Sequence, residues 1–304
     1  MRILLIVNPR ASSVTPKLEA IVEKALSEKH EVVAARTSHR GHATELAREA
    51  VAERMDAVVV FGGDGTLNEA ANGLIGTDVA LAILPGGSTN VFARTIGMTN
   101  DAVSAVDVLL DALARSAIEP IGIGTANGRA FLFHAGLGYD AAIVAEVERH
   151  QSLKRLAGQA LFAFAAVDTW LRHYDRDRPH FAVHLPDGTT IENGYYTIVL
   201  NTDPYTFLGS RPFRIAPEAG LGSPLAAITV QSLALWPLTQ VAAAALTNSE
   251  KVRSHPSVDY RADLAELRIV GYRPFPYQLD GDHLGDVNEV TFRHIPDAIR
   301  MVKP

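Results

Sequence analysis

The sequence predicts an α/β protein, in which an N-terminal doubly wound parallel-sheet domain is followed by a β-rich, antiparallel sandwich-like domain. Over about the first 115 residues, short apolar runs alternate with helical patterns. These runs are apolar at nearly every position, as strands buried on both faces of a parallel sheet are. Beyond about residue 120, most strand-like segments follow one another without a helix, which favours antiparallel pairing.

The strands of the N-terminal domain are predicted at residues 3–7, 31–35, 57–61 and 80–84. Its first two helices are expected at 16–28 and 42–54. Thr15 and Pro16 supply an N-cap and an N1 proline to the first helix. In the second helix, apolar residues recur every three or four positions along one face.

The strands of the second domain are predicted at 129–136, 180–185, 189–202, 225–233, 264–271 and 288–294. Helical stretches interrupt them at 139–173, with a break near Ser152, and at 236–249. The last residues, 298–303, are expected to return to the first domain. We therefore assign residues 1–120 and about 296–304 to the first domain, and 121–295 to the second.

Composition and charge exclude several classes of protein. The formal net charge of −6 argues against an electrostatic nucleic-acid binder. The absence of cysteine excludes a disulfide framework, a thiol nucleophile and a thiolate metal site. The N-terminal apolar run is too short for a signal peptide, and the longest apolar stretches fall short of the roughly 20 residues that span a bilayer. We therefore expect a cytoplasmic protein, with peripheral contact at the inner membrane face left open.

A glycine-rich segment, GGDGTLNE at 62–69, directly follows the strand at 57–61. Three glycines within four positions let the backbone approach a ligand closely, and the N-terminus of the next helix suits a phosphate group. Thr66 and Glu69 also fit a capping box, so a well-capped helix start is the alternative. Asp64 would repel a phosphate unless a divalent cation or a hydroxyl group lies between them.

Two further turns have the same setting. The strand at 80–84 ends in PGGSTN at 85–90, with a helix expected from about Val91, and the first strand ends in NPRASS at 8–13. All three turns follow predicted parallel strands. They therefore lie at the carboxyl edge of the sheet, where open α/β sheets bind ligands, and together they predict a phosphate-binding site.

Several common nucleotide and metal motifs are missing from the sequence. It contains no Gly-Lys dipeptide, and hence no Walker A lysine, and no G-x-G-x-x-G follows the first strand. The protein-kinase motifs and H-E-x-x-H are also absent. His180 and His184 lie in a strand-like segment beside Pro179, where solvated or hydrogen-bonded histidines are more common than a metal pair.

Three motifs together resemble the diacylglycerol kinase catalytic family: VNP at 7–9, FGGDGTLNE at 61–69 and LPGGSTNVFAR at 84–94. That family includes bacterial lipid kinases and sphingosine kinases, and it is more distantly related to NAD kinases. The resemblance extends in order over nearly the whole chain. The GGDGT element is shared with NAD kinases and phosphofructokinases, whereas the TNxFAR element that follows it indicates the lipid branch.

The resemblance implies an ATP- and Mg²⁺-dependent phosphotransferase that phosphorylates the hydroxyl group of diacylglycerol or a similar lipid, in a cleft between the two domains. The nucleotide would be held by Asn8, Pro9, Arg10, Ala11, Ser12, Thr37, Gly41, His42, Gly62, Gly63, Asp64, Gly65, Thr66, Leu67, Asn68, Glu69, Ser88, Thr89 and Asn90. Asp140, in GLGYD at 136–140, would face the lipid head group. Asp280 or Asp282, in LDGD at 279–282, would be the general base, and Asp64 would bind Mg²⁺ or relay a proton.

The chemistry agrees with these roles. Transfer of a γ-phosphoryl group needs held phosphates, Mg²⁺ and a carboxylate within reach of the attacking hydroxyl. An Asp-Gly pair at 280–281 is equally typical of a plain hairpin turn. Asp282 stands where the family usually has glutamate, and Gly222 and Ser223 stand where bacterial members have aspartates that bind a structural Mg²⁺. We therefore expect the catalytic Mg²⁺ to arrive with the ATP.

Residues 149–178 combine apolar side chains with flanking arginines and Lys154. Such a helix can lie on a membrane, but a core helix with solvated ends has the same composition. We expect a lipid substrate at a membrane surface and no nucleic-acid partner, with a homodimer left open. Two alternatives to a lipid kinase are NAD-kinase-like phosphorylation of a soluble substrate, and a nucleotide- or lipid-binding protein with little catalysis.

Overall fold

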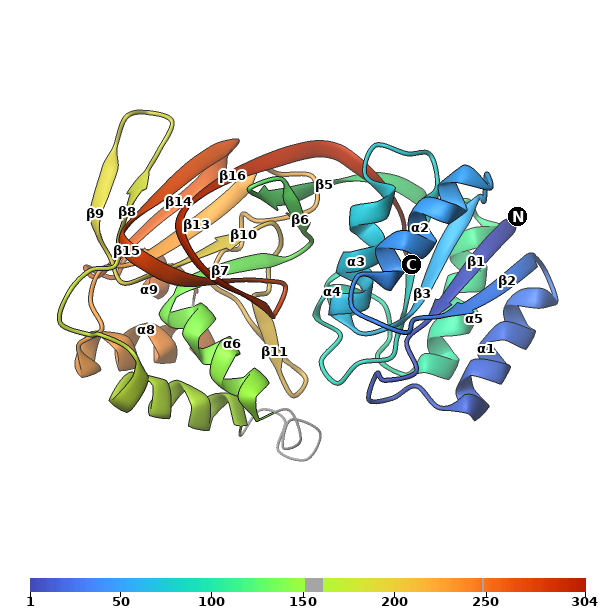
Figure 1. The fold of residues 1–304 in the computed structure, drawn as a ribbon, viewed down its shortest axis with the longest axis horizontal. Helices are drawn as coiled ribbons and strands as arrows, with labels where there is room; N and C mark the ends of the chain where they lie inside the picture. The colour runs from blue at the N-terminus through green and yellow to red at the C-terminus, as the bar shows by residue number, and fades with distance from the viewer. Residues whose placement is uncertain (151–160, 248) are drawn as a thin grey trace. The chain divides into compact units, whose positions relative to one another are not determined.

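The computed structural model describes residues 1–150, 161–247 and 249–304, which form two compact units (Figure 1). Unit 1 comprises Met1–Ile123 and Pro296–Pro304, and unit 2 comprises Gly124–Ile295. None of the described helices is both long and apolar enough to cross a membrane.

Unit 1 is built on a parallel sheet. Its strand order is β2 (Glu31–Arg36), β1 (Arg2–Val7), β3 (Ala57–Gly62) and β4 (Ala80–Pro85), followed by the last residues of β16 (Asp282–Val302). Every neighbouring pair in this order is parallel. The strands β1, β3 and β4 are almost entirely buried because their apolar side chains point to both faces. All the carboxyl ends therefore lie at one edge.

Helices cover both faces of this sheet. Helix α1 (Pro16–Ser27) packs beside α5 (Ala102–Ala114), and α2 (His42–Ala52) packs beside α3 (Asp64–Leu74) on the opposite face (Figure 1). The short helix α4 (Val91–Thr95) follows β4. As predicted, Thr15 caps α1, where its hydroxyl accepts from the Leu18 N–H over 3.2 Å, and Pro16 is the first helical residue.

The strands of unit 2 pair in antiparallel fashion. Its main strand order is β14 (Val258–Leu264), β13 (Leu225–Val230), β10 (Tyr196–Leu200), β7 (His134–Gly138), β15 (Glu266–Leu279) and β16. Strands β8 (Phe181–His184) and β9 (Thr190–Gly194) extend from β15, β5 (Ile118–Ala126) pairs with β6 (Arg129–Phe131), and β11 (Thr206–Leu208) pairs with β12 (Arg211–Phe213). The helical elements are α6 (Tyr139–Arg149), a helix over 161–168 that continues into the π-helical turn η1 (Thr169–His173), α8 (Leu235–Thr247) and α9 (Ser249–Arg253).

Two hydrophobic clusters lie on opposite faces of the sheet at its neighbouring strands β10 and β13. On β10, Val199 belongs to the cluster with the phenylalanines of β6, β8, β15 and β16, whereas Ile198 and Leu200 pack with residues of α8 and α9. This alternation is the period-two pattern of a strand buried on both faces. The parallel N-terminal sheet and the antiparallel C-terminal region confirm the predicted fold class.

Several predicted strand bounds differ from the structure. The segment predicted as one strand at 129–136 is two strands, because the Leu132 and Phe133 N–H groups donate to the carboxylate of Asp280 instead of to a neighbouring strand. The segment at 189–202 is likewise two strands, β9 and β10, and β15 extends well beyond 264–271. The sequence prediction omitted β5, β11, β12 and β14. Part of the predicted helix at 139–173, residues 151–160, lies outside the described residues.

Candidate active site

Three loops converge at the carboxyl edge of the unit 1 sheet. Asn8, directly after β1, donates its backbone N–H to Phe61 O over 3.0 Å and its side-chain amide to Thr66 Oγ1 over 2.8 Å. In the same loop, the Ser13 N–H donates to Gly86 O over 2.9 Å. The loops after β1, β3 and β4 are therefore joined to one another by hydrogen bonds.

The glycines of these loops are needed for close backbone contact. A Cβ on Gly86 would lie 3.0 Å from the Cα of Gly62, and a Cβ on Gly87 would lie 2.9 Å from the Cα of Gly63. Side chains at Gly86 and Gly87 would push the two loops apart. The glycine density therefore has a defined physical cause, which is the direct packing of one backbone on another.

Helix α3 begins within this group of loops. Its N-cap residue is Gly63, which has no side chain to accept from the first-turn N–H groups, and the helix is 11 residues long. Such a helix start presents backbone donors and the positive end of the dipole to an anion. Thr66 lies inside the first turn of α3, so the predicted capping box is not formed. The hydroxyl of Thr66 instead accepts from Asn8.

The Asp64 carboxylate caps the neighbouring helix. Its two oxygens accept from the Val91 N–H over 2.9 Å and from the Phe92 N–H over 3.0 Å, at the start of α4. Asn90, which precedes α4 in the left-handed conformation, accepts from Gly87 N and donates to Gly87 O. The negative charge of Asp64 is thereby partly compensated by two N–H donors, which reduces its repulsion of a nearby phosphate.

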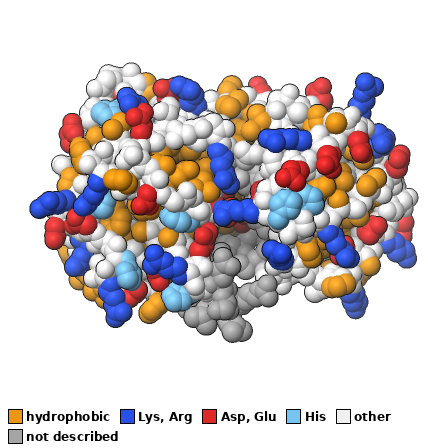
Figure 2. All heavy atoms as spheres, viewed as in Figure 1, with side chains coloured by type: hydrophobic (Ala, Val, Ile, Leu, Met, Phe, Trp, Pro, Cys, Tyr) orange, Lys and Arg blue, Asp and Glu red, His pale blue; other side chains and the backbone are white. Residues whose placement is uncertain are grey.

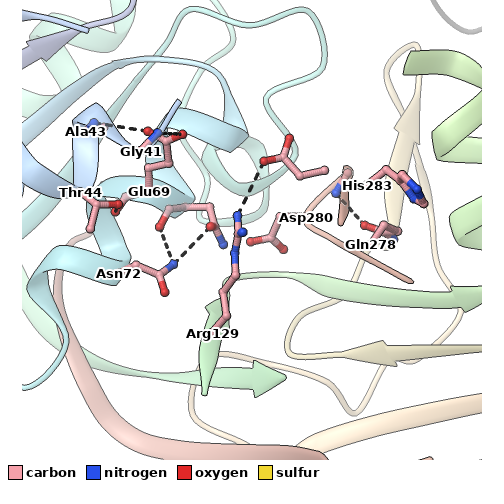
Figure 3. A network of polar contacts seen from close by, with 12 residues as sticks. Gly41, Ala43, Thr44, Glu69, Asn72, Arg129, Gln278, Asp280 and His283 are labelled. Carbon is pink, nitrogen blue, oxygen red and sulfur yellow. Dashed lines mark hydrogen bonds and ion pairs between the residues drawn. The ribbon is translucent and has the colours of Figure 1, made fainter. Parts of the chain in front are cut away.

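Glu69 connects α3 to the loop after β2. Its carboxylate accepts from the N–H groups of Gly41 over 2.8 Å and Ala43 over 3.3 Å, while its backbone carbonyl accepts from the Thr44 hydroxyl (Figure 3). These contacts occupy the start of α2. Glu69 therefore holds the loop in place and is not free to contact a ligand through both oxygens.

The other predicted nucleotide residues are distributed between surface and core. Thr37 is half-buried and donates its N–H to Val7 O, and His42 stacks on His39 with ring centroids 4.8 Å apart. Leu67 is fully buried in the core and Asn68 is almost so. The remaining predicted residues lie in the loops or at the start of α3 and are exposed or partly exposed: Pro9, Arg10, Ala11, Ser12, Gly65, Ser88 and Thr89.

In unit 2, the predicted Asp-Gly turn is present. Asp280 and Gly281 both have positive φ angles, of 50° and 83°, between the paired strands β15 and β16. This is the geometry of a tight hairpin turn that favours Asp-Gly. The buried Asp280 carboxylate accepts from the N–H groups of Leu132, Phe133 and His134, over 2.7 to 3.1 Å. Asp280 is therefore committed to holding the turn against β7.

Asp282 has a different environment. Its side chain is 31% exposed, and its Oδ2 lies 3.9 Å from Nη2 of Arg129. Figure 3 shows Arg129, Asp280 and Gln278 around the turn. Of the two carboxylates predicted as the base, Asp282 is the more exposed.

Asp140, at the start of α6, lies in a buried polar network. Its Oδ1 accepts from the Tyr205 hydroxyl over 2.6 Å and its Oδ2 accepts from Nε2 of Gln278 over 2.9 Å. Burial raises the pKa of Asp140, against the opposing effect of these two hydrogen bonds. The imidazole of His134 stacks obliquely on Tyr205, with ring centroids 4.4 Å apart, and burial lowers the pKa of His134 to about 3.

The neighbours Gln278, Tyr205 and His134 of Asp140 were not predicted from the sequence. Only the position of Gln278, two residues before the Asp-Gly turn, could have drawn attention to it. Tyr205 reaches Asp140 from 65 residues further along the chain, whereas His134 lies on β7, the strand directly before α6. Among the described residues, no group of three or more His, Asp or Glu side chains could hold a metal ion.

Comparison with known proteins supports the resemblance. Residues 2–126 match the family model described as the diacylglycerol kinase catalytic domain, which confirms the resemblance seen in the sequence. The chain is 34% identical over 166 residues to the diacylglycerol kinase of Bacillus subtilis strain 168, and 35% identical over 133 residues to a Pseudomonas putida protein named "Probable lipid kinase YegS-like". These alignments cover 53% and 43% of this chain, and 53% and 43% of the relatives, so the chain spans about half their length.

Two solved structures from Bacillus anthracis strain Sterne share the fold. One is a diacylglycerol kinase structure with a TM-score of 0.70 and 19% identity, which covers 100% of this chain and 97% of that chain. The other has a TM-score of 0.77 and 22% identity, and covers 100% of this chain and 95% of that chain. At this level of identity the likeness concerns the fold.

Proposed function

Because residues 2–126 match the diacylglycerol kinase catalytic domain, we propose that the protein is an ATP-dependent lipid kinase that transfers the γ-phosphoryl group to a lipid hydroxyl. The observation that carries the proposal is the start of α3. There a helix without a side-chain cap begins among three hydrogen-bonded loops at the carboxyl edge of a parallel sheet. Phosphate groups bind at such positions.

In this proposal the nucleotide binds to unit 1. The N–H groups of the first turn of α3 would donate to phosphate oxygens, and the loops after β1 and β4 would flank them. Leu67 and Asn68 support this turn from the core rather than contact the nucleotide. Thr37 and His42, which follow β2 at the same edge, are proposed to lie nearer the nucleoside.

The residues at the start of α3 are compatible with an Mg²⁺ ion that binds together with the nucleotide. Mg²⁺ commonly takes one or two protein carboxylates and completes its shell with phosphate oxygens and water. We propose that Asp64, the first residue of α3, would contribute such a carboxylate. When bound, Mg²⁺ would offset negative charge on the phosphates. The described residues offer no larger acidic cluster for it.

We propose that Asp282 is the general base and that Asp280 is not. The attacking hydroxyl oxygen would bond to the γ-phosphorus, the bond to the β–γ bridging oxygen would break, and the hydroxyl proton would pass to the Asp282 carboxylate. Asp282 is partly exposed, whereas three backbone donors hold Asp280. Asp140 is proposed to lie beside the lipid head group. That catalysis takes place between the two units stays a prediction.

The lipid substrate implies contact with a membrane. We propose that this contact is made by an apolar surface of unit 2, formed by Phe164, Val167, Leu171, Leu235 and Trp236, all of which are exposed. The Nε1–H of Trp170 donates to Leu233 O over 2.9 Å, which fixes the helix over 161–173 beside the start of α8. Large apolar side chains exposed together mark a binding surface.

Charged groups border this apolar surface. The guanidinium of Arg176 lies 4.0 Å from the ring centroid of Trp170, and Asp168 is paired with Arg172 and His173. Elsewhere acidic and basic side chains are interspersed over the visible face (Figure 2). The arginines beside exposed aromatic and aliphatic groups suit an anionic lipid surface. Residues 151–160 of the sequence-predicted membrane segment lie outside the described residues.

Phosphate transfer from γ-labelled ATP with Mg²⁺ tests the proposal. The acceptors are mixed micelles of diacylglycerol, monoacylglycerol, phosphatidylglycerol, ceramide or sphingosine, with NAD in a separate reaction. Label in a lipid, and loss of that label in Asp282→Asn, is the expected result. Label in NAD alone would replace the lipid with a soluble acceptor. ATP binding without transfer to any acceptor would show a binding protein with little catalysis.

A further inference from the structure

The side chain of Gln278 bridges two parts of unit 2. Its Nε2 donates to Asp140 Oδ2 over 2.9 Å, and its Oε1 accepts from the backbone N–H of Gly281 over 2.8 Å. Gln278 is fully buried. One amide group therefore connects the carboxylate at the start of α6 with the middle of the turn that precedes Asp282.

The strand beside Gln278 leaves space for this bridge. Gly136 on β7 pairs with Gln278, and a Cβ on Gly136 would lie 1.6 Å from Asp140 Oδ2 and 2.6 Å from Gln278 Nε2. Gly136 does not adopt a positive φ angle, so its backbone conformation is open to any residue. The position therefore needs glycine because the hydrogen bond between Asp140 and Gln278 occupies the space of a side chain.

Helix α6 holds the hairpin at a second point. Near its last turn, Glu148 Oε1 accepts from the backbone N–H of His283 over 3.1 Å. The turn is thus held by Gln278 before Asp282 and by Glu148 after it. The Asp280 carboxylate anchors the same turn to β7. A displacement of α6 would be transmitted to both sides of Asp282.

We propose that Gln278 is a positioning residue, which couples the head-group carboxylate Asp140 to the orientation of the base Asp282 through the N–H of Gly281. This inference rests on the proposed function and deepens it, since it assigns a residue that orients the base in response to the lipid site. The bridge fixes the turn when Asp140 is in place. Misplacing a reacting group by about 1 Å can lower a rate by about 100-fold.

Two replacements of Gln278 separate positioning from packing. Gln278→Met keeps the length of the side chain and removes both hydrogen bonds. Gln278→Glu keeps an acceptor for the Gly281 N–H but places an oxygen opposite Asp140. We expect kcat for the lipid to fall by about 10- to 100-fold in both variants at pH 8, with KM for ATP changed by less than about twofold.

The two variants are expected to differ in their pH profiles. Protonation of either Asp140 or the introduced carboxyl group restores an O–H donor between the two side chains, so the kcat of Gln278→Glu relative to wild type should rise between pH 8 and pH 6. Gln278→Met should show no such recovery. The other titratable groups that face the bridge are His134, Tyr139, Tyr196 and Tyr205. Burial lowers the pKa of the histidine and raises those of the tyrosines, so all four stay neutral in this range.

Gly136→Ala tests the same bridge from the neighbouring strand, and Gly222→Ala is its matched control. A Cβ on Gly222 would meet no atom within 4 Å, and neither glycine has a positive φ angle. We expect Gly136→Ala to lower kcat as Gln278→Met does, and Gly222→Ala to leave it unchanged. Equal kcat values in wild type, Gln278→Met and folded Gly136→Ala would overturn the proposal.

Hydrogen exchange distinguishes failure of this inference from failure of the proposed function. The Gly281 amide should exchange at least about tenfold faster in Gln278→Met than in wild type, because its acceptor is gone. This measurement needs no substrate. Unchanged Gly281 exchange would overturn the bridge even in an active kinase, whereas faster exchange in a protein inactive towards every lipid would leave the bridge standing and overturn the kinase assignment.

Discussion

Gly63 and Gly87 are in direct backbone contact, so that a Cβ on Gly87 would lie 2.9 Å from the Cα of Gly63. The two glycines belong to the loops after β3 and β4, and Gly63 is also the N-cap of α3. The position of the proposed phosphate-binding helix start therefore depends on how closely the second loop packs.

We predict that Gly87→Ala weakens ATP binding. The added methyl group must displace the Gly63 backbone, and the first-turn N–H groups of α3 then no longer converge on one phosphate. The expected result is a KM for ATP raised by about tenfold or more, with KM for the lipid unchanged. Gly222→Ala is the control. An unaltered KM for ATP in a folded Gly87→Ala protein would show that this loop contact does not shape the nucleotide site.

Two replacements of Asp64 separate the effect of its negative charge from the effect of its hydrogen bonds to the start of α4. Asparagine keeps one acceptor oxygen but carries no charge, and alanine has neither an acceptor nor a charge. The two Asp64 oxygens accept from two different N–H groups, so the NH₂ group of Asp64→Asn faces one of these donors. We expect Asp64→Asn to lower the free energy of unfolding by about 1 kcal/mol and Asp64→Ala to lower it by about 2 kcal/mol. Urea unfolding measures both values.

The same variants test the proposed contact of Asp64 with Mg²⁺. If the charge contributes, folded Asp64→Asn should need a higher Mg²⁺ concentration than wild type for half-maximal activity. The same Mg²⁺ dependence in Asp64→Asn and wild type would restrict Asp64 to capping α4.

Local sequence patterns predicted most of unit 1. The buried strands β1, β3 and β4 are uninterrupted apolar runs, and Thr15-Pro16 gives a local helix-start signal. The strand β5 was missed because IEPIGIGTA contains a proline and two glycines, which weaken a strand pattern. The strand β14 was missed although its sequence VDYRADL alternates apolar and charged residues at every position, which is the period-two pattern of a half-buried strand.

The candidate site could be predicted in outline but not in its contacts. The glycine loops and the Asp-Gly turn are local signals, and the structure contains both. The capping of α4 by Asp64, 27 residues away, and the holding of Asp280 by amides 146 to 148 residues away are not local. No spacing rule connects such residues, because their proximity follows from the order of the strands in the sheets.

The apolar surface of unit 2 yields a prediction about membrane binding. Val167 in this surface and Val33 on β2 of unit 1 are both exposed valines, 58% and 46% respectively, which makes them a matched pair. We expect Trp236→Ser and Val167→Ser to reduce co-sedimentation with vesicles that contain anionic phosphatidylglycerol, and Val33→Ser to have no effect. The affinity of Trp236→Ser should fall by at least about tenfold. Equal binding by all four proteins would place the contact elsewhere.

His134 makes stability sensitive to acid. Burial lowers its pKa from the ordinary value of 6.5 to about 3, so the unfolded chain binds a proton that the folded chain excludes. Its contribution to stability is therefore complete above pH 6.5 and decreases as the pH falls towards 3, by about 1.4 kcal/mol per pH unit. His134→Phe keeps a ring at this position and removes the titration.

The measurement is urea unfolding of wild type and His134→Phe between pH 7 and pH 4.5. The free energy of unfolding of wild type should fall more steeply than that of the variant below pH 6.5. Parallel curves would mean that His134 is protonated in the folded protein. His184→Phe, at a partly buried histidine of β8 whose Nδ1 lies 3.1 Å from Thr190 Oγ1, is the control variant.

We predict that Asp282→Asn lowers kcat and leaves stability unchanged, whereas Asp280→Asn lowers stability. Asp282→Asn removes the proposed proton acceptor from a partly exposed site, so kcat should fall by about 10²- to 10⁴-fold while stability is unchanged. Asp280→Asn sets an NH₂ group among three backbone donors and should lower the free energy of unfolding by about 1.5–3 kcal/mol. Phosphate-transfer kinetics and urea unfolding of both variants separate these effects. A stable Asp282→Asn protein with wild-type kcat would exclude Asp282 as the base, and a strongly impaired kcat in a stable Asp280→Asn protein would transfer that role to Asp280.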